Sequence, residues 1–305
     1  MCCLFGLHNY KNTLTRVQKS QLISELSMAA EERGTDATGI SYNAGSNLVI
    51  YKRPLPAHLM WFRVPKESTV VMGHTRMTTQ GNEAYNINNH PFPGTAGEHA
   101  FALAHNGVIW NDKVLRRNWG LPDTKVETDS YIAVQMLEQA GTVDFSSLQF
   151  MAEKLEGSFT ISVLTDQNEL FFVKGDNPLC IYHYEKLGLY LYASTESVLK
   201  KAVRKLPFKL GHPTKVTLVS GDILKIDPDG TRTKNGFCDD KLYSNYSQSW
   251  ADWPCFDSKE KYTDQEYLDD LKTVAACYGF TDDDVELMLE NGYTTDDIEE
   301  MLYCG

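Results

Sequence analysis

The stretch Met1-Cys2-Cys3-Leu4-Phe5-Gly6-Leu7 opens the chain and places a thiol beside the terminus, directly before an apolar strand. If Met1 is removed, Cys2 carries both a thiol and a free α-amine. The reference pKa of an α-amine is about 7.8 and that of a thiol about 8.5, so the amine can take the thiol proton at neutral pH. The stretch therefore predicts a cysteine nucleophile activated by its own amine. The alternative is that Cys2 is a small buried residue at the start of a strand.

The composition of the 305-residue chain is that of an ordinary globular protein, with 42% hydrophobic and 23% charged residues. The chain has no apolar run of about 18 residues and no signal-peptide pattern at its N-terminus, so we expect no membrane association. Its seven cysteines form no C-x-x-C pair. This usage indicates a reducing, cytoplasmic location and argues against a disulfide framework or a metal site of the zinc type.

The net charge of −12 is concentrated near the C-terminus. Residues 264–305 contain thirteen acidic residues and one basic residue, Lys272, which leaves 28 acidic and 28 basic residues for the rest of the chain. Neither part has the basic character that binding to nucleic acid requires.

The pattern of apolar residues predicts a layered α+β body with antiparallel sheets, because strands occur in blocks beside two long helices. We expect helices at 14–32 (ended by Gly34), 129–139, 146–155 and 196–204, and strands at 38–43, 48–52, 69–74, 101–105, 158–165, 169–174, 180–184, 188–193 and 214–226.

Three parts are expected along the chain: a main domain over 1–235, a linker or surface arm over 236–262, and an acidic helical appendage over 263–305. Thr281 and Thr294 or Thr295 occupy N-cap positions in the appendage, and the spacing of apolar residues there predicts three short helices.

Polar residues that suit a ligand site occur in three segments. Gly73-His74-Thr75-Arg76-Met77-Thr78-Thr79-Gln80-Gly81 ends a strand with polar side chains between two glycines, as a loop closing over a small ligand would. In Ala104-His105-Asn106-Gly107, which ends another strand, the Asn106 amide and the Gly107 N–H can form a two-donor oxyanion hole. Glu127-Thr128-Asp129 opens a helix, with Thr128 as its cap.

Each of these segments also has a structural interpretation without function. Arg76 can form an ordinary surface ion pair, Asn-Gly is a common tight-turn dipeptide, and Asp129 suits the start of any helix.

In this order, the motifs resemble the class II glutamine amidotransferases of the N-terminal nucleophile hydrolase superfamily, most closely the glutaminase domain of glucosamine-6-phosphate synthase. The family pattern Met-Cys-Gly-Ile-x-Gly is matched at residues 1–6, and Arg-Gly-x-Asp-x-x-Gly-Ile at 33–40. Further matches are His-Thr-Arg-Trp-Ala-Thr-x-Gly at 74–81, His-Asn-Gly at 105–107 and Glu-x-Asp at 127–129. Weaker matches continue to about residue 230, so the resemblance covers the main domain.

The resemblance implies a four-layer αββα sandwich and a reaction that hydrolyses L-glutamine to glutamate and ammonia through a thioester. Cys2 would be the nucleophile, and Asn106 and Gly107 would hold the oxyanion. No metal or organic cofactor is implied.

The resemblance also implies how the two charged ends of glutamine are held. Arg76 and Thr79 would bind the α-carboxylate, and Asp129 the α-ammonium. Met77 and Gln80 would complete the substrate-binding loop. Two residues depart from the family pattern: Cys3 replaces a glycine beside the nucleophile, and Met77 replaces a tryptophan in the lid over the ammonia exit.

The acceptor domains fused to this domain in the family are far larger than the 75 residues that follow the match. We therefore expect a glutaminase subunit that passes ammonia to a separate synthase partner. One alternative is a hydrolase of another amide on the same fold, although the pairing of Arg76 with Asp129 favours an amino-acid substrate. The other is a glutamine-sensing or scaffold protein with little turnover.

Overall fold

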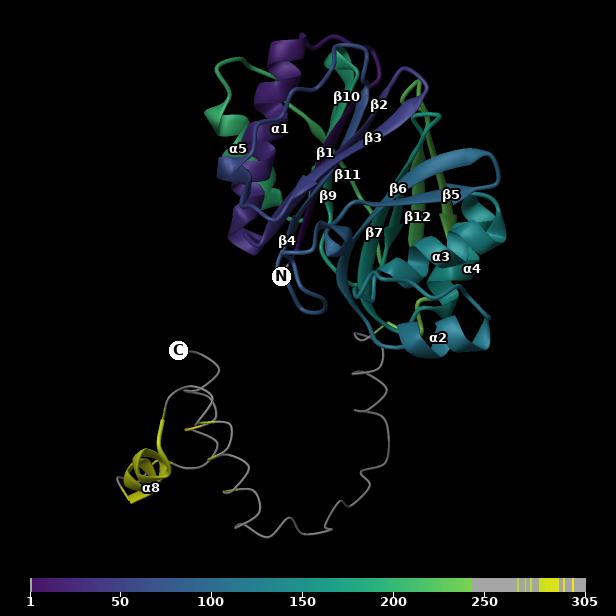
Figure 1. The fold of residues 1–305 in the computed structure, drawn as a ribbon. Helices are drawn as coiled ribbons and strands as arrows, with labels where there is room; N and C mark the ends of the chain where they lie inside the picture. Colours follow the sequence, from purple (N-terminus) through teal and green to yellow (C-terminus); the bar gives the residue numbers. More distant parts are fainter. Residues whose placement is uncertain are drawn as a thin grey trace. The chain divides into compact units, whose positions relative to one another are not determined.

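The computed structural model of the chain describes residues 2–242, 268, 272, 275, 280–290, 293 and 298 (Figure 1). The chain divides into two units, residues 1–249 and 250–305, and each is described here by itself.

The first sheet of the larger unit has seven antiparallel strands in the order β11-β9-β10-β1-β4-β2-β3. Strand β1 lies at its centre, paired with β10 on one side and β4 on the other. Every residue of β1 is buried, which accounts for the apolar run from Cys3 to Leu7. The strands are β1 (Cys3–Asn9), β2 (Ala37–Ala44), β3 (Asn47–Arg53), β4 (Val70–Arg76), β9 (Cys180–Tyr184), β10 (Leu189–Ala193) and β11 (Thr214–Val216).

The second sheet has six antiparallel strands in the order β13-β12-β8-β7-β6-β5. Its longest strand, β6, pairs with β7 along nine residues. The strands are β5 (Phe92–Ala96), β6 (His99–Ile109), β7 (Gly157–Thr165), β8 (Leu170–Lys174), β12 (Asp222–Ile226) and β13 (Arg232–Gly236).

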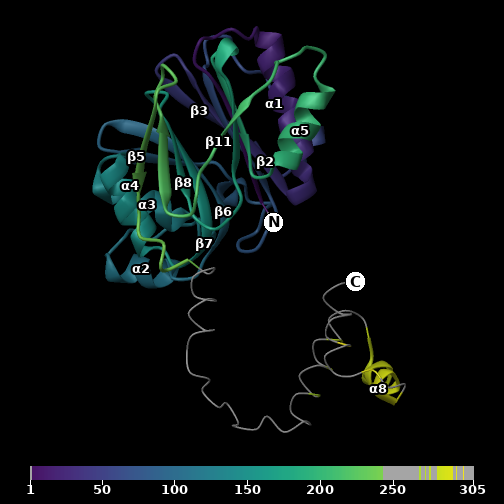
Figure 2. The same ribbon diagram turned by 180° about the vertical axis from the view of Figure 1, so that it is seen from behind.

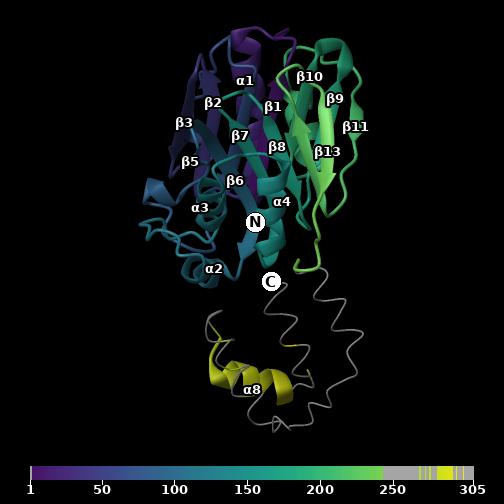
Figure 3. The same ribbon diagram turned by 90° about the vertical axis from the view of Figure 1, so that its right-hand side faces the viewer.

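Helices cover the outer faces of the two sheets, which gives the predicted four-layer αββα sandwich. Helices α1 (Arg16–Ala30) and α5 (Glu196–Lys205) lie on the outer face of the first sheet (Figure 2). Helices α3 (Tyr131–Ala140) and α4 (Phe145–Lys154) lie in front of the second sheet in Figure 3, with α2 (Asp112–Asn118) below them.

Three apolar cores separate these layers, and β1 contributes to two of them. Cys3, Phe5 and Leu7 point into the core under α1 and α5, whereas Leu4 points into the core between the sheets. This alternation follows from the two-residue period of a strand. It also settles where the second thiol lies: Cys3 is directed into the helix-side core.

Several predicted boundaries were wrong. The helix expected at 14–32 begins after Thr15, whose side chain caps it in a capping box with Gln18, and α1 ends at Ala30. Gly34 ends the short 3-10 helix Glu31–Arg33 that follows, not the α-helix itself. Thr128 does not cap the helix after it, because α3 begins at Tyr131 and Ser130 occupies its N-cap position.

The strand expected at 214–226 is two strands in different sheets. Gly221, with φ of +88°, turns the chain between β11 and β12, and the Asp222 N–H donates to the carbonyl of Val219. Periodicity also missed β5, α2 and β13, which are short or polar. Asn106 and Gly107 lie inside β6, not at its end.

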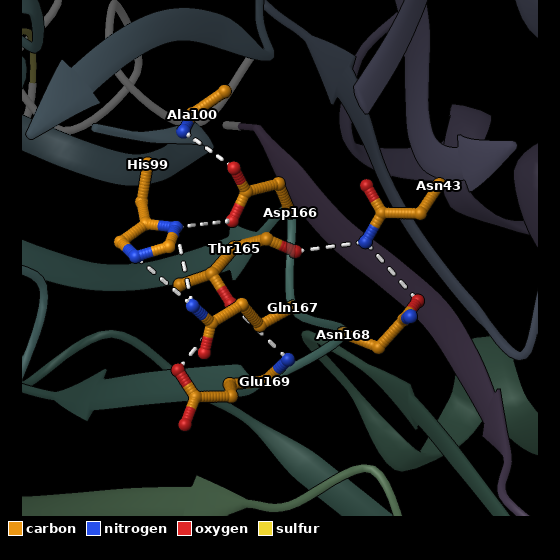
Figure 4. A network of polar contacts seen from close by, with 8 residues as sticks. All are labelled: Asn43, His99, Ala100, Thr165, Asp166, Gln167, Asn168 and Glu169. Atoms are coloured by element: carbon orange, nitrogen blue, oxygen red, sulfur yellow. Dashed lines mark hydrogen bonds and ion pairs between the residues drawn. The ribbon is translucent and has the colours of Figure 1, made fainter. Parts of the chain in front are cut away.

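A polar network joins the sheets at the turn between β7 and β8 (Figure 4). Asn43 of β2 donates from Nδ2 to the carbonyl of Thr165 at 2.8 Å and to Oδ1 of Asn168 at 3.1 Å. Asp166 accepts from the Ala100 N–H at 2.9 Å and contacts His99 Nδ1 at 3.2 Å. The network therefore ties β2 to the second sheet through side chains as well as through packing.

In the smaller unit, helix α8 (Asp282–Glu290) begins with a capping box. The Thr281 Oγ1 accepts from the Asp284 N–H at 3.3 Å, and Asp284 Oδ2 accepts from the Thr281 N–H at 2.8 Å. Ala275, Val285 and Ile298 are buried against one another. Most of the other two predicted helices, and the predicted linker beyond Leu242, lie outside the described residues.

Candidate active site

The Cys2 side chain lies directly before the central strand and is half-buried. Its Sγ is 3.4 Å from both the backbone N and the carbonyl O of Met77, and the Cys2 carbonyl accepts from Arg33 Nε at 3.0 Å. Burial raises the pKa of the Cys2 thiol, while the Met77 backbone, the terminal amine and Arg76 act in the opposite direction. Because burial dominates, the thiol needs a base to become a nucleophile.

Arg76 is the last residue of β4, and it braces the loop that follows. Its Nη1 donates to Asn89 Oδ1 at 2.7 Å, and its Nη2 donates to the carbonyls of Gln80 and Gly81 at 2.5 and 3.1 Å. The guanidinium is therefore held in place by fixed acceptors. Met77 and Thr79 are exposed on this loop.

The Asn106 side chain is buried and donates from Nδ2 to Ser194 Oγ at 2.5 Å. Gly107 has φ of +127°, and a Cβ there would lie 1.8 Å from the carbonyl oxygen of Ser158. Only glycine fits this backbone position. The strand thus places a buried amide side chain next to a half-buried glycine backbone.

Asp129 connects the end of β6 to the start of α3. Its carboxylate accepts from the Ile109 N–H at 2.6 Å and from the Ser130 N–H at 2.8 Å. The same carboxylate acts electrostatically on both Cys2 and Arg76, raising the pKa of the thiol. A thiol, a cation and an anion are therefore gathered in one region of the sandwich.

Three buried histidines lie beside this region, and sequence reasoning gave them no role. The rings of His74 and His90 are 4.2 Å apart, and His74 Nε2 contacts the carbonyl of His105 at 3.0 Å. Burial lowers the pKa of all three, that of His74 to about 3, so they are neutral at pH 7. Among the described residues, no group of three or more His, Cys, Asp or Glu side chains is arranged to hold a metal ion.

Two further residues that shape the site were not assigned a role from the sequence. Glu127 accepts at Oε2 from the Asn82 N–H at 3.0 Å and from Asn88 Nδ2 at 2.8 Å, so it clamps the loop after Arg76. Its place in the Glu-Thr-Asp segment was the available signal. Ser194 lies some 90 residues beyond its partner Asn106, and no local pattern links the two.

Comparison with known proteins finds relatives of similar sequence and a solved structure of the same fold. No protein-family model matches the chain. A glutamine–fructose-6-phosphate aminotransferase (isomerizing) of Bacillus thuringiensis is 31% identical over 159 residues, covering 50% of this chain and 26% of the relative. The enzyme of that name from Staphylococcus epidermidis is 27% identical over 236 residues, covering 74% of this chain and 37% of the relative.

A solved structure, the glutamine phosphoribosylpyrophosphate amidotransferase of B. subtilis complexed with ADP and GMP, shares the fold. It matches with a TM-score of 0.62 at 18% identity over 78% of this chain and 49% of that one. The sequence relatives and the shared fold are consistent with a class II glutamine amidotransferase domain in the larger unit.

The amidotransferase domain accounts for only part of these relatives. The chain spans about a quarter to just over a third of the length of the curated relatives it matches, as the coverages of 26% and 37% show. No helix among the described residues is long and apolar enough to cross a membrane.

Proposed function

We propose that the amidotransferase domain hydrolyses L-glutamine to glutamate and ammonia through a γ-glutamyl thioester on Cys2. The observation that carries the proposal is the grouping of the Cys2 thiol with the Arg76 guanidinium, which lowers the pKa of the thiol, and the Asp129 carboxylate, which raises it. Free glutamine carries an α-carboxylate, an α-ammonium and a side-chain amide. One cation, one anion and one nucleophile match these three groups.

In the proposed reaction, the α-amine of Cys2, freed by removal of Met1, takes the thiol proton. The sulfur bonds to the amide carbon, and the oxyanion accepts hydrogen bonds from Asn106 Nδ2 and the Gly107 N–H. The amine then gives its proton to the leaving nitrogen, the C–N bond breaks and ammonia departs. Water adds to the thioester, the C–S bond breaks, and glutamate and the thiol are released.

Substrate binding is assigned to the loop after β4 and to the start of α3. Arg76 and Thr79 take the α-carboxylate, and Asp129 takes the α-ammonium. Met77 and Gln80 line the same loop. This proposed chemistry uses side chains, backbone and water, and needs no cofactor.

The ammonia acceptor is proposed to be a separate synthase in a reducing, cytoplasmic compartment. Support for an ammonia acceptor comes from the name of the relatives, which includes fructose 6-phosphate beside glutamine. The acidic residues 264–305 are proposed to dock this domain onto a basic surface of that partner. Such docking would weaken as salt rises past about 0.15 M, where the Debye length is about 8 Å.

Ammonia release from L-glutamine by the purified, Met1-processed chain is the direct test of the activity. An amide hydrolase of another kind would prefer amides that lack the α-carboxylate and α-ammonium. A sensing protein would bind glutamine without releasing ammonia. Either result would contradict the proposed glutaminase.

Deletion of residues 264–305 tests the docking role separately. We expect ammonia release to remain nearly unchanged and binding to the acceptor to fall. Loss of the glutaminase activity, or unfolding of the amidotransferase domain, would show that the acidic segment is structural.

A further inference from the structure

Ser194 follows β10 and fastens the beginning of the central strand. Its N–H donates to the Leu4 carbonyl at 2.9 Å, and its Oγ accepts from the Leu4 N–H, also at 2.9 Å. This pair of bonds extends the pairing of β1 with β10 beyond Phe5 and Ala193, where the regular ladder ends. Ser194 therefore holds the backbone two residues from Cys2.

The same hydroxyl reaches across to the second sheet. Ser194 Oγ accepts from Asn106 Nδ2 at 2.5 Å, so one oxygen receives both the Leu4 N–H and an N–H of the Asn106 amide. A hydroxyl oxygen has two lone pairs, and these two donors fill them. Both side chains are buried, so no bulk water is available to replace either bond.

An amide nitrogen carries two hydrogens in a plane. When one N–H of Asn106 is held by Ser194, the planar geometry fixes the direction of the other. An oxyanion donor contributes to catalysis only if it is oriented before the charge develops, and a displacement of about 1 Å can lower a rate about 100-fold.

We propose that Ser194 is a positioning residue for the glutaminase reaction. Its Oγ orients the second N–H of Asn106 toward the oxyanion and holds the start of β1, with Cys2, in register with that donor. This inference rests on the proposed function, because the oxyanion forms only if Cys2 attacks an amide.

The test measures ammonia release by Ser194→Ala, with Ser41→Ala as a matched control. Ser41 is also a fully buried strand serine, in β2, and its hydroxyl has no hydrogen-bond partner among the described residues. We expect kcat to fall about 10- to 100-fold in Ser194→Ala with KM within about twofold, and to stay within about twofold in Ser41→Ala. An unchanged kcat in Ser194→Ala, or an equal fall in Ser41→Ala, would overturn the proposal.

A double variant separates positioning from general stability. In an Asn106→Ala background, Ser194→Ala should lower kcat by much less than it does in the wild type, because the amide that it orients is absent and only its hold on the start of β1 remains. A further fall of the same size would show that Ser194 does not act through Asn106. If Ser194→Ala does not fold, Ser194→Cys, a near-isosteric side chain with a weak acceptor, is tested in its place.

Side-chain amide NMR keeps this inference distinct from the proposed function. If the wild-type chain releases no ammonia, the proposed function fails, and the Asn106 side-chain resonances then decide the role of Ser194. We expect the two amide protons of Asn106 to differ in shift and exchange rate in the wild type and to become more alike in Ser194→Ala. Identical spectra would overturn the positioning role.

Discussion

The buried histidines make the domain sensitive to acid, and His74 allows the size of the effect to be calculated. Burial lowers the pKa of His74 from 6.5 to about 3. Between these values the unfolded chain binds a proton that the folded chain excludes. The free energy of unfolding is therefore not reduced by His74 above pH 6.5. Below that pH it falls by about 1.36 kcal/mol per pH unit until the folded group titrates near pH 3.

Between pH 6.5 and 5.0, His74 alone should reduce the free energy of unfolding by about 2 kcal/mol. The variant His74→Gln removes the titrating group and keeps a donor that can reach the carbonyl of His105. Urea unfolding of both proteins at several pH values gives the comparison. We expect the wild type to lose about 1.36 kcal/mol more per pH unit than the variant over this interval.

His8, on the neighbouring strand β1, provides a parallel measurement. Burial lowers the pKa of His8 from 6.5 to about 4, so His8→Gln should show the same change in slope, ending near pH 4. If wild type and His74→Gln lose stability with equal slope, His74 is not held neutral by burial, and the reasoning fails.

Four further predictions concern the site itself. Cys2→Ala should abolish ammonia release with the fold intact by circular dichroism, and electrophilic glutamine analogues should label Cys2 in preference to the buried Cys3; normal turnover would refute the nucleophile. Arg76→Ala should raise KM for glutamine about 10- to 100-fold, since a charged hydrogen bond contributes about 1.5–3 kcal/mol; an unchanged KM in steady-state assays would remove Arg76 from substrate binding. Asn106→Ala should lower kcat about 10²–10³-fold, and an effect on KM alone would contradict an oxyanion role. Gly107→Ala should destabilise the fold by roughly 3 kcal/mol or more in urea unfolding, because its Cβ would overlap the Ser158 carbonyl; a stable variant would show that the strand can shift.

The sequence predicted the layers of the fold and the segments that form the site, because both leave local patterns. The apolar run after Cys2 predicts a buried strand. The polar residues that follow the apolar run at 69–74 predict the end of a strand, which the structure places at Arg76. The family resemblance supplied the αββα arrangement. What local patterns do not contain is the sheet to which a strand belongs, so 214–226 was read as one strand although Gly221 divides it between two sheets.

Local sequence patterns also do not predict hydrogen bonds between residues that are far apart in the chain. Asn106-Gly107 has the composition of a tight turn, yet tertiary pairing with β7 keeps it extended inside β6. Nothing in the residues around Ser194 indicates that its hydroxyl accepts a hydrogen bond from Asn106 in the folded chain. Thr128 has the residue type of a helix cap, but Asp129 bonds to the end of β6 and the helix begins two residues later.

The position of β1 at the centre of its sheet has a consequence for synthesis of the chain. Its neighbours are β4, at Val70–Arg76, and β10, at Leu189–Ala193, so one edge of β1 has no native partner until about 190 residues have been made. At roughly 5–20 residues per second this takes on the order of 10–40 s. During that interval the segment around Cys2 remains open to enzymes that trim nascent chains, before the sandwich closes around it.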